Sequence, residues 1–281
     1  MNLRKLGKRL YETDKDMVTK SKPKAIILRT AGTNCDVETA FAFETVGAKS
    51  DMVHINRLAT KKTKLSDYDI LAIPGGFSYG DDVASGKILA NEIRYKLKSE
   101  LKQFIKSGKI IIGICNGFQV LVKAGLLPNL ENDFESIDVS LSLNDSAKFE
   151  DRWVCLKKTE STKCIWTKDL QEVINLPVAH AEGKFIPGNA SILKKLKNNN
   201  QIVLQYCNKR GERDSYPWNP NGSIDDIAGI CDASGRVFGL MPHPERHIQH
   251  TQHPYWTRLA KRGEGDGLKI FRNGVEFVKT L

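Results

Sequence analysis

The sequence of 281 residues lacks any hydrophobic run long enough to cross a membrane, and no apolar signal-peptide core follows its N-terminus. Its six cysteines form no Cys-x-x-Cys pair and have no spacing typical of a disulfide framework. Hydrophobic content of 40% and charged content of 27% are ordinary for a globular protein. These features predict a cytoplasmic protein whose cysteines stay reduced.

Nucleotide-binding signatures are also missing. The nearest approach to a P-loop runs from Gly80 to Lys87, but it has one residue too many, and Ile88 stands where Ser or Thr is needed. Asp81 and Asp82 would in addition repel a phosphate. No dinucleotide-binding fingerprint is present either. We therefore expect no cofactor in this chain and assign any ATP-dependent step to another polypeptide.

The basic charge is concentrated near the N-terminus. Residues 1–24 hold eight Lys/Arg and three Asp/Glu, which is half of the net charge of +10. The rest of the chain has no basic stripe interleaved with aromatic residues, as a nucleic-acid surface would need. We predict a basic extension over residues 1–23 and one domain over residues 24–281, with no nucleic acid and no membrane as partner.

The order of the expected elements indicates an α/β fold with a mixed, mainly parallel sheet and helices on both faces. Short apolar runs predict strands at 24–29, 51–55, 69–73 and 110–114. Amphipathic stretches between and after them predict helices at 36–46, 85–107 and 116–124. Later strands are expected at 137–143, 152–157, 201–206, 227–231 and 237–241, with a strand and turn at 176–185 and a closing helix at 268–278. In such folds, ligands bind at the carboxyl ends of the parallel strands.

The first candidate site residue is Cys115, which ends an apolar strand within the pattern Gly113-x-Cys115-x-Gly117. Small residues on either side allow the sharp strand-to-helix turn of a nucleophile elbow. The N-terminus of the following helix favours negative charge and hence a thiolate there. The ordinary alternative is a structural thiol that closes a core strand.

The second candidate is the pair Gly75-Gly76, which follows the strand at 69–73. Two adjacent glycines at a strand end can expose backbone N–H groups to a developing oxyanion. This role suits a cysteine elbow on a neighbouring strand, and we expect it for these two glycines.

The third candidate is His243-x-Glu245, after the last strand. A histidine there can accept a thiol proton while the carboxylate orients its ring. The histidines at 247, 250 and 253 follow closely and leave zinc binding as a rival use. No cysteine or carboxylate completes a known zinc spacing with them, so the predicted site contains no metal.

Six segments together resemble the class I (triad-type) glutamine amidotransferases, and more narrowly the glutaminase subunits of phosphoribosylformylglycinamidine synthase. They are Gly-Ile-Cys-Asn-Gly-Phe-Gln (113–119), Pro-Gly-Gly-Phe-Ser-Tyr-Gly-Asp (74–81), Met-Pro-His-Pro-Glu-Arg (241–246), Phe-Glu-Asp-Arg-Trp-Val (149–154), Pro-Val-Ala-His-Ala-Glu-Gly (177–183) and Asn-Pro-Asn-Gly-Ser-Ile-Asp (219–225). The likeness runs from about Lys24 to the C-terminus. Ala181 departs from the pattern, where glycine is usual, and the basic leader lies outside it.

The resemblance implies a three-layer, flavodoxin-like fold and a glutaminase. Cys115 would attack the glutamine amide, with His243 as base and Glu245 orienting it. The N–H groups of Gly76 and Asn116 would form the oxyanion hole, and Gly75 and Gln119 would help to bind glutamine. The ammonia would pass to the large subunit of formylglycinamidine ribonucleotide synthetase, which uses ATP and Mg, with a small bridging subunit as a further partner.

Two other functions stay open on the sequence alone. A stand-alone cysteine-elbow hydrolase, such as a deglycase or peptidase, would not need His243-x-Glu245 after the final strand. A basic binding protein with an incidental cysteine would bind nucleic acid in a salt-dependent way even without residues 1–22.

Overall fold

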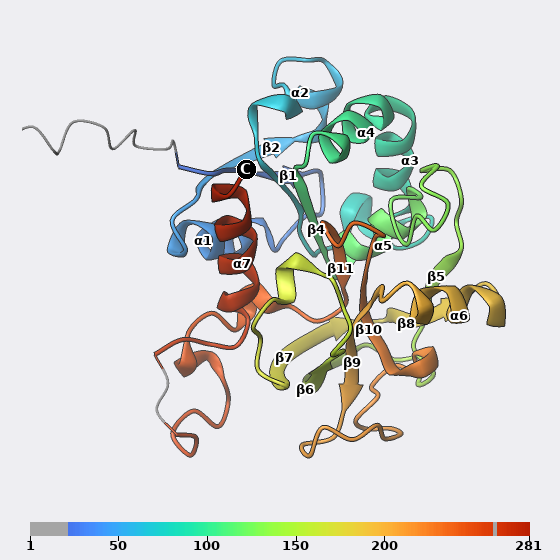
Figure 1. Ribbon diagram of the computed structural model, residues 1–281, viewed down its shortest axis with the longest axis vertical. Coiled ribbons are helices and arrows are strands. Elements are labelled where there is room, and N and C mark those ends of the chain that lie inside the picture. Colours follow the sequence, from blue (N-terminus) through green and yellow to red (C-terminus); the bar gives the residue numbers. More distant parts are fainter. Residues whose placement is uncertain (1–21, 261–262) are drawn as a thin grey trace, which may run out of the picture.

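A computed structural model of the chain describes residues 22–260 and 263–281 (Figure 1). The predicted extension at 1–23 lies outside these ranges except for its last two residues, so its boundary remains a prediction. The main sheet has nine strands in the order β2 (Lys49–His54), β1 (Lys24–Arg29), β3 (Ile70–Ile73), β4 (Ile110–Ile114), β11 (Val237–Leu240), β10 (Ile227–Cys231), β9 (Ile202–Cys207), β6 (Glu150–Lys158) and β7 (Val173–His180). A two-stranded sheet pairs β5 (Val139–Leu143) with β8 (Glu182–Pro187).

The main sheet has a parallel half and an antiparallel half. Strands β2, β1, β3, β4 and β11 pair in parallel, whereas β10, β9, β6 and β7 continue the sheet through antiparallel pairs. Both β3 and β4 are buried along their whole length. Their near-continuous runs of isoleucine and other apolar residues fit strands that are covered on both faces. The predicted mixed, mainly parallel α/β sheet is confirmed.

The α-helices lie on both faces of the sheet (Figure 1). They are α1 (Asp36–Thr45), α2 (Ile55–Ala59), α3 (Lys87–Lys96), α4 (Lys98–Lys106), α5 (Asn116–Lys123), α6 (Ala190–Asn198) and α7 (Leu268–Lys279). Six 3₁₀ turns complete the described elements: η1 (Leu65–Asp67), η2 (Ser78–Asp81), η3 (Ile165–Thr167), η4 (Ile224–Asp226), η5 (Pro244–Arg246) and η6 (His250–Gln252). Helices α1 and α7 pack together through Phe43 and Phe271, whose rings lie edge to face with their centroids 5.0 Å apart.

Three details of the predicted elements were wrong. The single helix expected at 85–107 is two helices, because Leu97 takes non-helical dihedral angles (φ −122°, ψ 5°) between α3 and α4. The break lets α3 pack on α5 while α4 packs on β4. The strand and turn expected at 176–185 are two strands, β7 and β8, which are separated at Ala181 and belong to different sheets. Helices α2 and α6 were not predicted.

The turn between β4 and α5 depends on close backbone contact at Gly117. A Cβ atom added there would lie 1.8 Å from the carbonyl oxygen of Ile73 at the end of β3. Gly117 therefore lets α5 start directly against the neighbouring strand. This contact holds the elbow in place.

Gly117→Ala is expected to destabilise the fold by about 1–3 kcal/mol or more, because the backbone of β3 or α5 must shift to relieve the clash. Urea unfolding followed by circular dichroism measures this change. Gly263→Ala is the matched control, since a Cβ there would touch nothing within 4 Å. Equal urea concentrations at the midpoint of unfolding for the two variants would contradict the proposed packing constraint.

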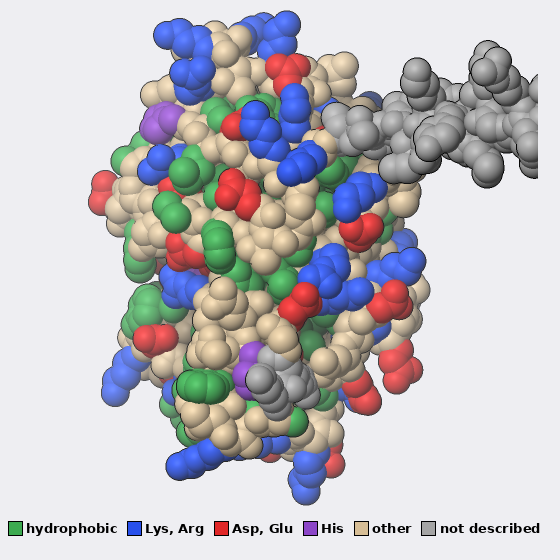
Figure 2. Space-filling model, turned by 90° about the vertical axis from the view of Figure 1, so that its left-hand side faces the viewer, with side chains coloured by type: hydrophobic (Ala, Val, Ile, Leu, Met, Phe, Trp, Pro, Cys, Tyr) green, Lys and Arg blue, Asp and Glu red, His purple; other side chains and the backbone are tan. Residues whose placement is uncertain are grey.

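Two surface observations bear on partners. No helix in the described ranges combines the length and the apolar character that crossing a bilayer requires. The face drawn in Figure 2 carries Lys and Arg side chains scattered among Asp and Glu, without a continuous basic stripe. That face thus offers no track for a nucleic-acid backbone.

Candidate active site

Cys115 stands between β4 and α5 in a strained backbone conformation. Its dihedral angles are φ 51° and ψ −107°, a region that residues other than glycine rarely occupy. Such strain costs about 1–3 kcal/mol and persists where the surrounding structure imposes it. The backbone N–H of Cys115 donates to the carbonyl of Leu240 in β11 (2.8 Å), and its side chain is 5% exposed. The geometry is that of a nucleophile elbow.

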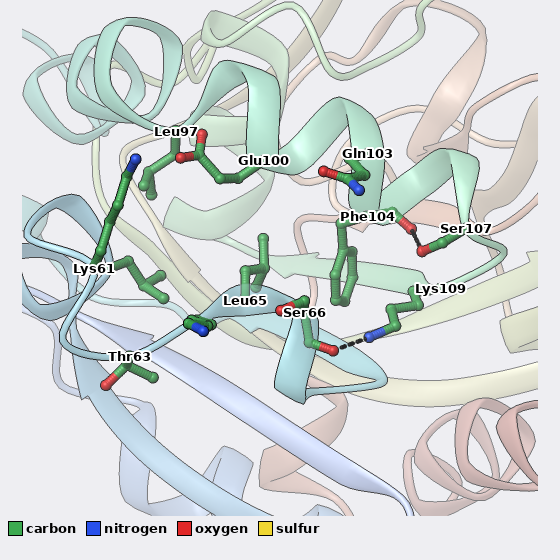
Figure 3. A pocket seen from close by; sticks show the side chains of 12 residues that line it. Lys61, Thr63, Leu65, Ser66, Leu97, Glu100, Gln103, Phe104, Ser107 and Lys109 are labelled. Atoms are coloured by element: carbon green, nitrogen blue, oxygen red, sulfur yellow. Dashed lines mark hydrogen bonds between the residues drawn. The ribbon is translucent and has the colours of Figure 1, made fainter.

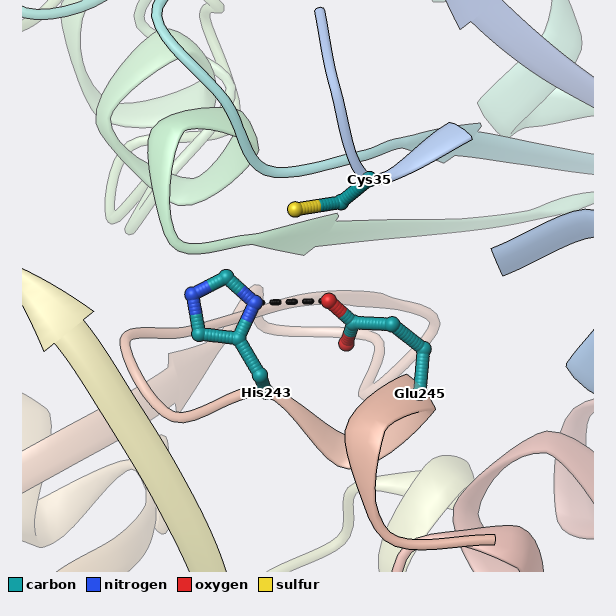
Figure 4. A group of neighbouring side chains, drawn as sticks. All are labelled: Cys35, His243 and Glu245. Atoms are coloured by element: carbon teal, nitrogen blue, oxygen red, sulfur yellow. Dashed lines mark hydrogen bonds and ion pairs between the residues drawn. The ribbon is translucent and has the colours of Figure 1, made fainter. Parts of the chain in front are cut away.

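His243 and Glu245 follow β11 and form a buried pair. The backbone N–H of His243 donates to the carbonyl of Pro177 in β7 (2.8 Å), which fixes the turn against the antiparallel half of the sheet. Nδ1 of His243 lies 2.6 Å from Oε1 of Glu245 (Figure 4). Both side chains are 1% exposed. An ionised carboxylate only accepts hydrogen bonds, so Nδ1 must carry the hydrogen and donate this hydrogen bond to Glu245.

The electrostatics around His243 favour its charged form. Burial by itself would lower the pKa of His243. The negative charge of Glu245 and the neighbouring thiol of Cys115 outweigh burial and hold that pKa well above its usual value. Nε2 of His243 has no hydrogen-bond partner in the described part of the chain. The imidazole can therefore accept a proton at Nε2, and Glu245 stabilises the imidazolium that results.

Gly75 lies between Cys115 and His243. A Cβ atom added there would come within 2.8 Å of Cε1 of His243 and 3.5 Å of Cβ of Cys115. The thiol-bearing elbow and the histidine turn thus meet on either side of this glycine. A side chain at position 75 would occupy the space between Cys115 and His243.

The other predicted site residues occupy the same region. Gly76 has φ +139°, and an added Cβ would lie 2.8 Å from both Asn34 N and Gly32 O. The carboxamide of Asn116 accepts from the Ser78 N–H at 3.3 Å and so ties the loop at 74–83, called here the glycine loop, to α5. The backbone N–H of Asn116 belongs to the first turn of α5, where N–H groups have no partner within the helix.

Gln119 is held by the protein at both ends of its amide. Its Nε2 donates to the carbonyl of Glu182 at 2.5 Å, and its Oε1 accepts from Nδ2 of Asn116 at 3.0 Å. These bonds connect α5 to the start of β8. The predicted contact of Gln119 with glutamine stays a prediction, and its bonds within the protein point to a positioning role.

Cys35, which was not among the predicted site residues, borders the site. Cys35 is the N-cap residue of α1, at the same edge of the sheet as Cys115. Nη2 of Arg246 donates to its sulfur at 3.1 Å, and the thiol donates to Oδ1 of Asn34 at 3.2 Å. Burial is the main cause that raises the pKa of the Cys35 thiol. Its position after a strand, before a helix, was the available signal.

His180 is a second group whose role was not foreseen, although its segment was recognised as a motif. Nδ2 of Asn144 donates to the carbonyls of Lys148 (2.9 Å) and His180 (2.8 Å). Oδ1 of Asn144 therefore faces the Gly183 N–H and Nδ1 of His180, both at 3.1 Å. Because this oxygen can only accept hydrogen bonds, Nδ1 must be the protonated nitrogen of His180. Burial and then the charge of His243 lower the pKa of His180 to about 3. It stays neutral and does not compete for the catalytic proton.

The rival zinc site is not formed. In the described ranges, the histidines at 247, 250 and 253 do not join any group of three potential ligand atoms. His247 and His253 instead pack edge-on against the ring of Trp153, with ring centroids 4.9 and 4.6 Å away. These imidazoles support the loop that follows the catalytic turn.

A cavity of about 390 Å³ lies elsewhere, between α4 and the segment that precedes β3 (Figure 3). Leu65, Leu97 and Phe104 are among its apolar lining, and Lys61 and Lys109 are among its polar lining. None of the predicted site residues contributes to it. The chemistry of Cys115 therefore does not use this cavity.

The chain is similar to known proteins over most of its length. A profile of the CobB/CobQ-like glutamine amidotransferase domain matches residues 22–278. A protein of Dehalococcoides mccartyi named phosphoribosylformylglycinamidine synthase subunit PurQ is 49% identical, over 93% of this chain and 100% of that protein. A protein of the same name from Methanococcus maripaludis is 45% identical, over 91% of this chain and 97% of that protein. The solved structure of PurLQS from Thermotoga maritima contains a chain with TM-score 0.69 and 32% identity, covering 91% of this chain and 99% of that one.

Proposed function

The chain belongs to the glutamine amidotransferases, within them to the PurQ-type subunits of phosphoribosylformylglycinamidine synthase, and we infer that Cys115, His243 and Glu245 are its catalytic triad. The protein hydrolyses glutamine and supplies the ammonia for making formylglycinamidine ribonucleotide in purine biosynthesis. The observation that carries the triad is the buried 2.6 Å pair of His243 and Glu245 beside the elbow cysteine. Stand-alone hydrolysis, the alternative from sequence, is not favoured.

The first half of the reaction forms a thioester. Nε2 of His243 takes the thiol proton of Cys115, and the sulfur attacks the side-chain carbonyl of glutamine. The imidazolium then gives this proton to the leaving nitrogen, so ammonia departs and a glutamyl thioester remains on Cys115. Glu245 keeps the ring oriented and stabilises its positive charge throughout.

The second half releases glutamate. His243 removes a proton from a water molecule that attacks the thioester carbonyl. The sulfur leaves and takes the proton back, which restores the thiol or its ion pair with His243. In both halves the carbonyl oxygen becomes an oxyanion next to the elbow. We assign its stabilisation to the N–H groups of Gly76 and Asn116, and losing one such donor costs roughly 2.7–4 kcal/mol in the barrier.

The synthetase half of the reaction requires a partner. The solved relative is described as part of PurLQS. We accordingly assign this chain a PurL synthetase and a PurS subunit as partners, and place ATP and magnesium on the synthetase. The six cysteines of this chain are all free and buried, which suits a reducing compartment. We propose that the protein works in the cytoplasm.

The isolated chain is expected to be a poor glutaminase, and the complex a good one. The glycine loop carries the exposed side chains of Phe77 and Val83, so a docking partner would contact it directly. The loop includes Gly76, whose peptide can turn its N–H toward or away from the oxyanion. Gaining one donor accounts for roughly 10²–10³ in rate.

The test is steady-state glutamate release by the chain alone, and then with synthetase, ATP and formylglycinamide ribonucleotide. Formation of the amidine from glutamine in the same mixture checks the transfer of ammonia. A chain that releases glutamate at the same rate in both states would contradict the gating. A fully assembled complex that makes amidine from ammonia and never from glutamine would overturn the proposed function.

A further inference from the structure

One group in the described part of the chain brings three different metal-ligating atoms together. It consists of the sulfur of Cys35, a nitrogen of His243 and a carboxylate oxygen of Glu245, all within 4.8 Å of one another. Figure 4 shows the sulfur of Cys35 directed toward the hydrogen-bonded pair. All three side chains are buried.

The proposed reaction does not use all of this group. Cys35 takes no part in the proton relay, since the elbow and its strain belong to Cys115. In addition, Oε2 of Glu245 is buried without a hydrogen-bond partner in the described ranges. Buried polar atoms without partners are rare in folded proteins and call for an explanation. A metal ion bound at this group would give that carboxylate oxygen a partner.

The chemistry of the three atoms selects a particular kind of ligand. Thiolate sulfur, imidazole nitrogen and carboxylate oxygen are the atoms that bind Zn²⁺ in proteins. Bond lengths of about 2.3 Å to sulfur and 2.0–2.2 Å to nitrogen or oxygen put tetrahedral ligand atoms roughly 3.3–3.6 Å apart. The observed cluster can reach that spacing by side-chain adjustment, with the metal replacing the hydrogen bond between His243 and Glu245.

The charges also balance. One thiolate and one carboxylate neutralise a divalent cation, so the buried set would carry no net charge. Arg246 donates to the sulfur of Cys35 at 3.1 Å and would stabilise the thiolate. The positive charge of Arg246 is itself offset by Glu38, whose carboxylate lies 3.9 Å from its Nε.

We propose that Cys35, His243 and Glu245 form an inhibitory binding site for Zn²⁺, in which the metal switches off the glutaminase. This inference rests on the proposed function, because the metal acts by occupying the base and its orienting carboxylate. A coordinated His243 cannot take the proton of Cys115. Glutamine hydrolysis would stop, while the partner would still use free ammonia.

The activity test uses the assembled complex, with free Zn²⁺ set by a metal buffer and Mg²⁺ kept constant. Zinc should abolish glutamine-dependent synthesis, a chelator should restore it, and ammonia-dependent synthesis should continue. Cys35→Ser should keep its activity but need at least about 100-fold more zinc for inhibition, since loss of even an outer-shell partner weakens metal binding 10–100-fold. Cys155→Ser removes a buried thiol outside the site and should respond like the unaltered protein.

A binding test separates this site from simple metal capture by Cys115. The Cys115→Ala variant, titrated with Co²⁺, should still develop the charge-transfer absorption of a thiolate bound to cobalt. The absorption should disappear when Cys35→Ser is added to that variant. A Cys35→Ser complex as sensitive to zinc as the unaltered one, or cobalt absorption that survives without Cys35, would overturn the inference. Because cobalt binding needs no turnover, this result stands apart from any failure of the proposed glutaminase.

Discussion

Replacing Cys115 by alanine is expected to abolish glutamine-dependent synthesis, with a loss of about 10³-fold or more, because no thioester can form without the sulfur. Synthesis from added ammonia should stay intact, since that step takes place on the partner. The two rates, measured with the same assembled complex, check the prediction. A glutamine analogue that carries an electrophile should label Cys115 first, as mass spectrometry of the digested protein would show.

The neighbouring thiol supplies the matched control for this prediction. Cys35 lies in the same site but outside the proton relay, so Cys35→Ala should retain most of the glutamine-dependent rate. The four remaining cysteines are buried elsewhere and should remain unlabelled. An adduct found mainly on Cys35, or a Cys115→Ala variant that still uses glutamine, would show that the nucleophile has been assigned to the wrong residue.

Glu245→Gln should lower glutamine turnover by about 10⁴-fold with the fold intact, as happens when the orienting carboxylate of a serine protease triad is made an amide. The amide keeps the shape of Glu245 but cannot stabilise the imidazolium of His243. It also offers an NH₂ group that competes for the 2.6 Å contact with Nδ1. Single-turnover release of ammonia measures the chemical step directly.

His243→Ala should be at least as damaging as Glu245→Gln, and the double variant hardly worse than His243→Ala alone. This non-additivity follows because the carboxylate acts only through the imidazole. Unfolding curves of all three variants show whether the lost rates reflect lost structure. Losses that add in full would mean that the two residues serve different steps.

The proposed catalytic residues could be singled out from the sequence because each stands in a local pattern. Cys115 is marked by its two glycines, and His243 by the prolines on either side of it and the carboxylate two residues later. The strands were equally clear, since runs such as Ile110–Ile114 admit few other structures. The alternation of strands and helices up to residue 124 predicted the parallel part of the main sheet.

What could not be predicted depends on contacts between distant segments. The apolar spacing of the helix expected at 85–107 continues across Leu97, so nothing local marks the break that packing against α5 and β4 imposes. Cys35 stands between a predicted strand and a predicted helix, but no local pattern marks it as a neighbour of His243. Only the sheet order β1, β3, β4, β11 reveals that it faces His243. The tautomer of His180 likewise depends on Asn144, 36 residues away.

The position of β11 has a consequence for the growing chain on the ribosome. Strand β4 is completed at Ile114, but its neighbour on one side is synthesised more than 100 residues later, at 237–240. Until then β4, which is apolar throughout, has an unpaired edge of the kind that promotes aggregation. Cys115 also lacks its proposed base, because His243 emerges only after that strand. We therefore expect a nascent or truncated polypeptide to release no ammonia until its last strand closes the sheet.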